Sequence, residues 1–142
     1  MQKTLTILKP DTVKAANTGA IIDRLEKEGF RIRAMKMVHL TQAQAEGFYD
    51  VHRERPFFGS LVKFMTEGPV VTMVLEADNA IEKLRKVMGA TDPAKAEAGT
   101  IRKQFATNIE RNAIHGSDGP ETAAFEVSYF FNRLEEFRGQ VT

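Results

Sequence analysis

The stretch "GPVVTMVLEA", residues 68–77, is apolar over nearly its whole length and begins with a Gly-Pro pair. A run of this kind, bounded by turn residues, predicts a central buried strand. The segment "KTLTILK", residues 3–9, alternates Leu5 and Ile7 with threonines and stops at Pro10, which has no amide hydrogen for a strand ladder. We therefore expect a sheet with its central strand at 68–77 and its first strand at 3–9.

The other elements follow from helical or alternating spacing of apolar residues and from start and stop signals. These signals predict a helix from Thr18 to a stop at Gly29, a strand within 30–40, a helix opening at Thr41 with Gln44 in capping-box spacing, a short helix within 55–65, a capped helix within 78–89, a short helix near 100–106, and a last strand at 122–131. This order fits the α+β, ferredoxin-like βαββαβ motif, a four-stranded antiparallel sheet with helices on one of its faces. Residues 90–121 show little periodicity, and so long a loop before the last strand predicts a functional segment.

Composition narrows the classes of function. The chain fits a single domain over 1–142, and its 20 basic and 19 acidic residues leave a net charge of +1, which argues against a broad surface field for nucleic acid or membranes. It has no cysteine, which excludes a catalytic thiol, and no apolar run near the roughly 18 residues of a membrane span. The N-terminal segment lacks the apolar core of a secretory signal, so we expect a cytoplasmic protein with no membrane partner.

One of the three histidines, His115, stands in "RNAIHGSDGPE", residues 111–121, among residues typical of turns. An unprotonated imidazole, with an ordinary pKa of about 6.5, is a competent nucleophile or base at neutral pH. Such a ring needs one nitrogen held, and Glu126, on the polar register of the last predicted strand, is the nearest candidate in the chain. The alternative is a turn histidine without a role and a glutamate that pairs with an arginine. Spacing leaves both interpretations open.

Isolated cations stand at the ends of predicted elements, although neither G-x-G-x-x-G nor the G-x-x-x-x-G-K-[ST] phosphate loop occurs. Lys9 ends the first strand, Arg85 lies in the last turn of a helix, and Arg102 lies at the start of a short helix. Arginine forks in particular suit phosphate oxygens. The alternative for each of these residues is a solvated surface charge.

Six motifs occur together and in order: "ILKPD", "FYDVHRERPFFG", "SLVKFMTEGPVV", "MGATDP", "GTIRKQF" and "NAIHGSD". In identity and separation they resemble the nucleoside diphosphate kinases, and the resemblance runs from about Thr4 to Phe131. It implies an enzyme that transfers the γ-phosphate of a nucleoside triphosphate, mainly ATP, to nucleoside diphosphates. It also implies a ping-pong reaction through a phosphohistidine.

The resemblance assigns roles to individual residues. It makes His115 the nucleophile and Glu126 the residue that orients its ring. The remaining implied site residues are Lys9 and Tyr49 in catalysis, Lys9, His52, Phe57, Arg85, Thr91, Arg102 and Asn112 in nucleotide binding, and Ser117 and Asp118 in support. Mg2+ is the expected cofactor, carried mainly by the nucleotide phosphates and assisted by Asp118, with no direct protein ligand.

Two further expectations concern partners. The family resemblance implies a homo-oligomer, either a tetramer or a hexamer; Ala98 stands where many members have proline in a loop that packs at subunit contacts. An RNA-binding module with this type of sheet is disfavoured, because the aromatic pattern of such modules is missing and the net charge is near zero, so we expect no obligatory nucleic acid. The alternative function is a catalytically idle regulatory or interaction protein of the same fold.

Overall fold

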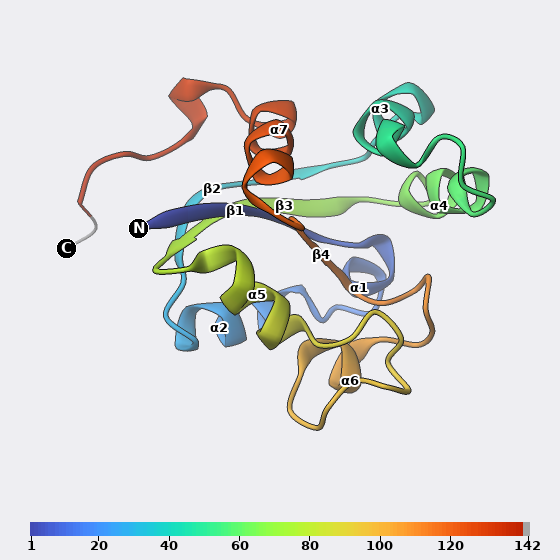
Figure 1. Ribbon diagram of the computed structural model, residues 1–142, viewed down its shortest axis with the longest axis horizontal. Coiled ribbons are helices and arrows are strands. Elements are labelled where there is room, and N and C mark those ends of the chain that lie inside the picture. Colours follow the sequence, from blue (N-terminus) through green and yellow to red (C-terminus); the bar gives the residue numbers. More distant parts are fainter. Residues whose placement is uncertain (141–142) are drawn as a thin grey trace.

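The computed structural model describes residues 1–140 and contains one four-stranded sheet. The strands are β1 (Gln2–Leu8), β2 (Arg31–Val38), β3 (Val70–Ala77) and β4 (Ile114–Gly116). Their order across the sheet is β2-β3-β1-β4, and every neighbouring pair is antiparallel. The predicted antiparallel sheet is confirmed, with the apolar stretch at 70–77 in an interior position, where Figure 1 shows it between β2 and β1.

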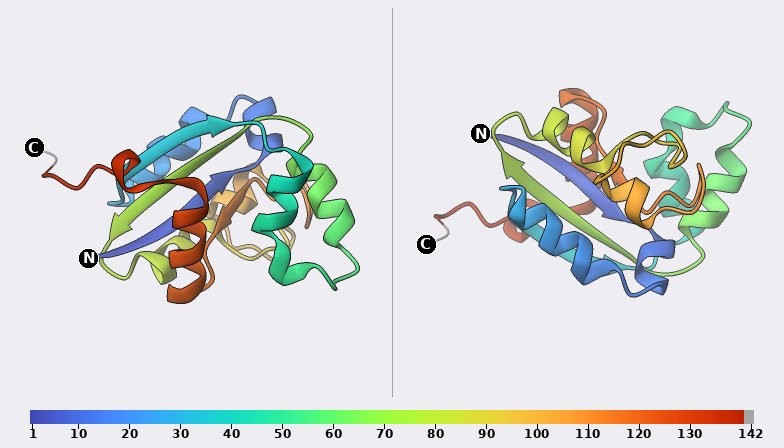
Figure 2. Two further views of the ribbon diagram at one scale, coloured as in Figure 1. Left: turned by 90° about the horizontal axis from the view of Figure 1, so that it is seen from above. Right: turned by 90° about the horizontal axis from the view of Figure 1, so that it is seen from below.

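Helices cover both faces of the sheet. They are α1 (Pro10–Lys14), α2 (Thr18–Lys27), α3 (Gln42–Phe48), α4 (Phe58–Met65), α5 (Ala80–Met88), α6 (Ile101–Phe105) and α7 (Pro120–Phe130), with short 3-10 turns η1 (Asp50–His52) and η2 (Arg133–Glu135). Figures 1 and 2 show α3 and α7 on one face and α2, α5 and α6 on the other. None of these helices is long and apolar enough to cross a membrane.

The prediction of helices on one face is therefore wrong, and β3 shows why. Val70 and Val74 pack into a core with α3, α4 and α7, whereas Met73 and Leu75 pack into a second core with α2, α5 and α6. Because successive side chains of a strand point to opposite faces, a continuously apolar strand needs cover on both sides. The run of apolar residues at 70–77 reflects the burial of β3 on both faces of the sheet.

Several boundaries agree with the start and stop signals. The Thr41 hydroxyl accepts from the Gln44 backbone N–H at 3.1 Å, and the Gln44 side chain accepts from the Thr41 N–H at 2.9 Å, so the predicted capping box is confirmed. Helix α2 begins at Thr18, and Gly29 after it has φ +96°, the left-handed conformation that ends a helix at little cost for glycine.

The segment predicted as the last strand is a helix instead. Pro120 occupies the first helical position of α7, and the Thr122 hydroxyl accepts from the Gly119 N–H at 2.9 Å. The buried residues Ala123, Glu126 and Phe130 follow helical spacing, but a glutamate in this set hides the apolar stripe. The alternating aromatic residues that suggested a strand are largely on the outer side, with Phe125 and Tyr129 exposed.

The last strand lies inside the predicted loop. Residues 90–121 contain α6 and then β4, which has only three residues and is too short to show a period of two. His115 is therefore the middle residue of a strand rather than part of a turn. The irregular chain before β4 still forms the long loop that the sequence predicts ahead of the last strand.

We expect Thr41→Ala to lower the free energy of unfolding by about 1 kcal/mol, because the first backbone N–H groups of α3 lose their capping oxygen. Chemical denaturation measures this value. Thr41→Ser is the matched control and should stay close to wild type, since it keeps the hydroxyl. Equal losses in the two variants would contradict the capping explanation.

Candidate active site

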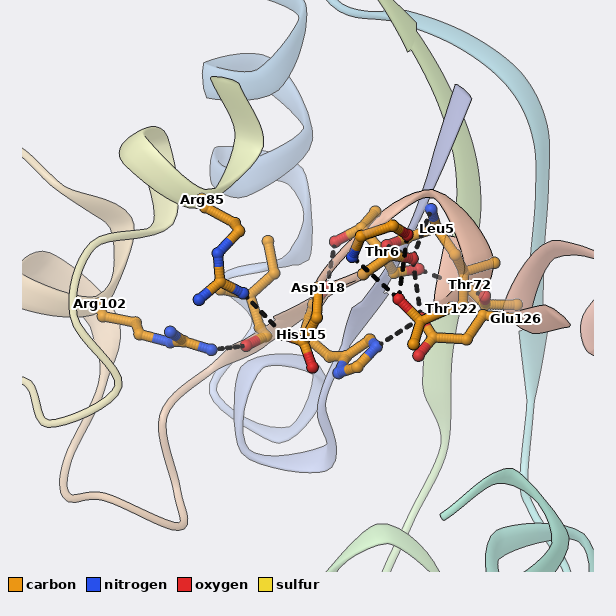
Figure 3. Close-up of polar contacts among 12 residues, drawn as sticks. Leu5, Thr6, Thr72, Arg85, Arg102, His115, Asp118, Thr122 and Glu126 are labelled. Atoms are coloured by element: carbon orange, nitrogen blue, oxygen red, sulfur yellow. Dashed lines mark hydrogen bonds and ion pairs between the residues drawn. The ribbon is translucent and has the colours of Figure 1, made fainter. Parts of the chain in front are cut away.

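Strand β4 brings His115 to the edge of the sheet beside β1. His115 pairs with Ile7 in the ladder, and the Thr6 hydroxyl donates to the His115 carbonyl at 2.7 Å. The His115 side chain is 18% exposed, so its ring reaches the surface from a rigid backbone. Figure 3 shows Arg85 and Arg102 on one side of this ring and Glu126 on the other.

One nitrogen of the ring is held by Glu126 from α7. His115 Nε2 lies 2.8 Å from Glu126 Oε1, and the Ser117 hydroxyl donates to the same oxygen at 2.8 Å. Ser117 is fully buried, and its own oxygen accepts from the Leu5 N–H at 3.2 Å. Because an ionised carboxylate only accepts hydrogen bonds, Nε2 is the donor in the neutral ring, and the lone pair lies on Nδ1.

Lys9 follows β1 and is buried, although it carries an ammonium group. Its Nζ donates to Asn112 Oδ1 at 2.8 Å, and Asn112 Nδ2 donates in turn to the Ile109 carbonyl at 3.0 Å. Burial, reinforced by the nearby Arg102 charge, lowers the pKa of Lys9 to about 8. The sequence prediction brought Lys9 and Asn112 to one site, and the structure places them in contact.

Arg102 is the second buried cation. It projects from α6 and donates to three backbone carbonyls, those of Gly89 at 3.1 Å, Asn112 at 3.3 Å and Ile114 at 2.7 Å. Burial, with a smaller contribution from the charge of Arg85, lowers the pKa of Arg102 to about 10, so it stays protonated at neutral pH. Arg102 therefore ties the long loop to β4 while bringing a positive charge close to His115.

Arg85 and Asp118 form an exposed pair at the side of the site. Arg85 Nη1 donates to Asp118 Oδ1 at 2.7 Å, and both side chains are more than half exposed. Thr91 lies next to Asn112, whose Nδ2 donates to the Thr91 carbonyl at 3.5 Å.

Three rings lead from His115 towards the surface at α4. The Tyr49 ring stands edge-on to His115 at 6.3 Å between centroids and is stacked with His52 at 6.4 Å, while His52 lies 5.5 Å from Phe57. The Tyr49 hydroxyl is buried and has no hydrogen-bond partner within residues 1–140, and burial, together with the Glu126 charge, raises its pKa. Phe57, by contrast, is 46% exposed.

Sequence reasoning missed several residues that shape this site. Thr6 fixes the His115 carbonyl, and Phe48 packs edge-on against the His115 ring at 5.4 Å. Asp11 accepts from the backbone N–H of Ala113, which has φ +74°. Two of these residues stood in the family motifs without a role, Asp11 in "ILKPD" and Phe48 in "FYDVHRERPFFG".

A histidine held by a carboxylate, with two arginines on the other side of its ring, suits one class of protein, the phosphotransferases that carry the phosphate on a side chain of their own. Comparison with known proteins agrees. The family model "Nucleoside diphosphate kinase" matches residues 2–136. The chain belongs to the nucleoside diphosphate kinase family.

Individual relatives cover nearly the whole chain. The nucleoside diphosphate kinase of Desulfosudis oleivorans is 62% identical over 95% of this chain and 97% of that protein, and the one of an Anaeromyxobacter species is 63% identical over 92% and 89%. The Aquifex aeolicus nucleoside diphosphate kinase structure superimposes with a TM-score of 0.93 at 47% identity, covering 95% of this chain and 98% of that one. A Halobacterium salinarum nucleoside diphosphate kinase in complex with CDP gives 0.95 at 35% identity, over 99% and 93%.

We expect kcat/KM for nucleotides to fall as the pH rises through about 8. Lys9 has its lowered pKa in this range and loses its positive charge above it, so attraction to phosphates weakens. The measurement is a pH profile of kcat/KM between about pH 6 and 10. Lys9→Met should lower kcat/KM and lack this limb, whereas Lys14→Met, which removes an exposed lysine, should keep it. A wild-type profile that stays flat through pH 8 and up to pH 10 would contradict the assignment.

Proposed function

We propose that this enzyme transfers the γ-phosphate of a nucleoside triphosphate, mainly ATP, to nucleoside diphosphates through a phosphohistidine on His115. The observation that supports this most directly is the 2.8 Å contact between His115 Nε2 and Glu126 Oε1. It holds the ring in one orientation and leaves the Nδ1 lone pair available. Nucleophilic catalysis of this kind divides one transfer into two easier ones.

In each half-reaction, one bond to the transferred phosphorus forms and one breaks. Nδ1 of His115 attacks the γ-phosphorus, the bond from that phosphorus to the bridging oxygen breaks, and the nucleoside diphosphate leaves. An oxygen of the terminal phosphate of a second nucleoside diphosphate then attacks the same phosphorus, and the P–N bond breaks. The proton on Nε2 stays between His115 and Glu126, where the carboxylate stabilises the positive ring that forms in each step.

Three cations would neutralise the phosphates. Lys9 and Arg102 are held by neutral groups, the Asn112 amide and backbone carbonyls, so their charges remain available to an anionic ligand. Arg85 is paired with Asp118, and we propose that it exchanges this exposed carboxylate for a phosphate oxygen. Positioning and charge neutralisation account for most of the catalysis of phosphoryl transfer.

The aromatic rings near His115 would contact the transferring group and the nucleotide base. The Tyr49 hydroxyl, buried and without a hydrogen-bond partner among residues 1–140, stays protonated and would donate to the transferring group. Phe57 is exposed and would stack on the base, with His52 beside it and towards the phosphates. Stacking reads no base edge, which fits an enzyme that accepts many nucleosides.

Mg2+ fits the site as an ion that arrives with the nucleotide. No group of three or more metal-ligating side chains comes together within the described residues, and the exposed carboxylate of Asp118 beside Arg85 is the acidic group best placed to hold water on such an ion. When bound, Mg2+ would reduce the charge on the phosphates. Lys9, Asn112 and the backbone near Thr91 would then bind the sugar and phosphates around it.

The proposals on assembly, cellular location and domain organisation are based on the sequence. We propose a homo-oligomer, a tetramer or a hexamer, of one domain per chain that acts in the cytoplasm without obligatory nucleic acid. Light scattering on the purified protein measures the assembly directly. A monomer at micromolar concentration would contradict the proposed oligomer.

The first test uses Mg-ATP labelled at the γ-phosphate, without an acceptor. We expect label on the protein that survives denaturation, is labile to acid and stable to base, and is discharged by GDP or CDP. His115→Ala should bind ADP as wild type does and take up no label. A folded wild type that binds ATP without becoming labelled would contradict the proposal and favour the catalytically idle alternative.

Glu126→Ala should reduce the rate of His115 phosphorylation by about 10- to 100-fold with little change in nucleotide affinity. The substitution removes the carboxylate that accepts from Nε2, so the imidazole ring is no longer held in one orientation. Rapid quench at saturating ATP measures this rate. Glu121→Ala removes an exposed carboxylate from the same helix and is the matched control. Equal rates in the two variants would mean that Glu126 does not orient the ring.

A further inference from the structure

Ala113, two residues before His115, has an unusual backbone. Its φ is +74° although it is not glycine, and it is fully buried. The Ile114 N–H donates to the Asn112 carbonyl at 2.9 Å, which closes a γ-turn around Ala113. A γ-turn with a positive central φ is rare and strained, because the Cβ approaches the backbone carbonyl. Something must therefore hold this turn in place.

The start of α1 holds both polar groups of Ala113. The Ala113 N–H donates to Asp11 Oδ2 at 3.0 Å. The Ala113 carbonyl accepts from the Lys9 N–H and from the Thr12 hydroxyl, each at 2.9 Å. Asp11 is the one member of this clamp, residues 9–12, that acts on the N–H side of Ala113 through its side chain.

The clamp is connected to the site at both of its ends. Before Ala113, the Asn112 side chain accepts from Lys9 Nζ; after it, the Ile114 carbonyl accepts from Arg102 at 2.7 Å. The chain then enters β4, where the His115 carbonyl is fixed by Thr6. A different φ at Ala113 would redirect the backbone on one side of the ring while these other contacts remain.

We propose that Asp11 is a positioning residue that keeps the Ala113 turn in its left-handed form and thereby sets the direction in which His115 meets the phosphate. This inference rests on the proposed function of His115. It predicts a loss in the rate of phosphorylation, because displacement of a nucleophile by about 1 Å can cost on the order of 100-fold. Nucleotide affinity should change far less, since the Asp11 carboxylate hydrogen-bonds to the Ala113 backbone and reaches Lys9 only through its charge, which Asp11→Asn removes as well.

The test compares Asp11→Ala with Asp11→Asn in rapid-quench phosphorylation at saturating labelled ATP and neutral pH. Asp11→Ala should be slower by about 10- to 100-fold, with its Kd for ADP within about threefold of wild type. Asp11→Asn should stay within about threefold in rate, because its amide oxygen can accept from the Ala113 N–H. Asp23→Ala removes an exposed carboxylate from α2 and should behave as wild type.

A second arm replaces Ala113 itself. Glycine adopts a positive φ without strain, so Ala113→Gly makes the turn less dependent on the clamp. In that background, Asp11→Ala and Asp11→Asn should be phosphorylated at similar rates, within about twofold, which is the coupling that a double-mutant cycle detects. This arm also decides the matter if Asp11→Ala fails to fold with alanine at 113.

Each adverse outcome has its own meaning. A wild type without phosphohistidine overturns the proposed function, and this inference with it. A wild-type phosphohistidine together with a fast Asp11→Ala overturns this inference alone, as does an Asp11→Asn that is as slow as Asp11→Ala. A persistent difference between the two Asp11 variants with glycine at 113 also overturns it, because Asp11 would then act by another route.

Discussion

The antiparallel pairing of β4 with β1 is the constraint on which the rest of the site depends. Strand β4 is short, yet it sets His115 against Ile7 and places Ser117 where its oxygen accepts from Leu5. The chain that continues from β1 then supplies Lys9 to Asn112 and Asp11 to Ala113. One short ladder thus brings the N-terminal residues and the histidine segment together, and Glu126 and the arginines complete a site that this pairing has already outlined.

In the part of the chain that the structure describes, two of the three cations of the site are buried without a carboxylate partner. Lys9 and Arg102 are buried cations, and each donates mainly to neutral oxygen atoms rather than to a carboxylate. Burial of charge without an opposite partner is unfavourable, which is why the pKa of both groups is lowered. A triphosphate would supply the missing negative charge. Its binding would then offset the free energy that burial of the two cations costs in the free protein. Arg85 differs, because Asp118 is already its partner at the surface.

The sequence predicts the core elements and fails where local patterns are short or mixed. The capping box at Thr41 and the buried central strand β3 are strong local signals, and both are confirmed. Helix α7 was mistaken for a strand because exposed aromatic residues alternate along it and Glu126 interrupts its buried face. The family motifs carry the identities of the candidate site residues, and the structure brings His115 into contact with Glu126, and Lys9 into contact with Asn112. The positive φ of Ala113 could not be predicted, because alanine rarely adopts a left-handed conformation and its presence in a sequence does not indicate one.

The distance in sequence between the two halves of the site has a consequence for synthesis. The contacts of Lys9 with Asn112 and of Leu5 with Ser117 span 103 and 112 positions. Closing loops of this length costs chain entropy before the contacts form, and such distant pairings slow folding. During translation, β1 leaves the ribosome first and can pair with β3 once residues 70–77 follow, but its other edge stays unpaired until residues 114–116 follow. A chain stopped before β4 would have β1 and most of its helices but neither His115 nor Glu126, so the candidate active site exists only once nearly the whole polypeptide has been made.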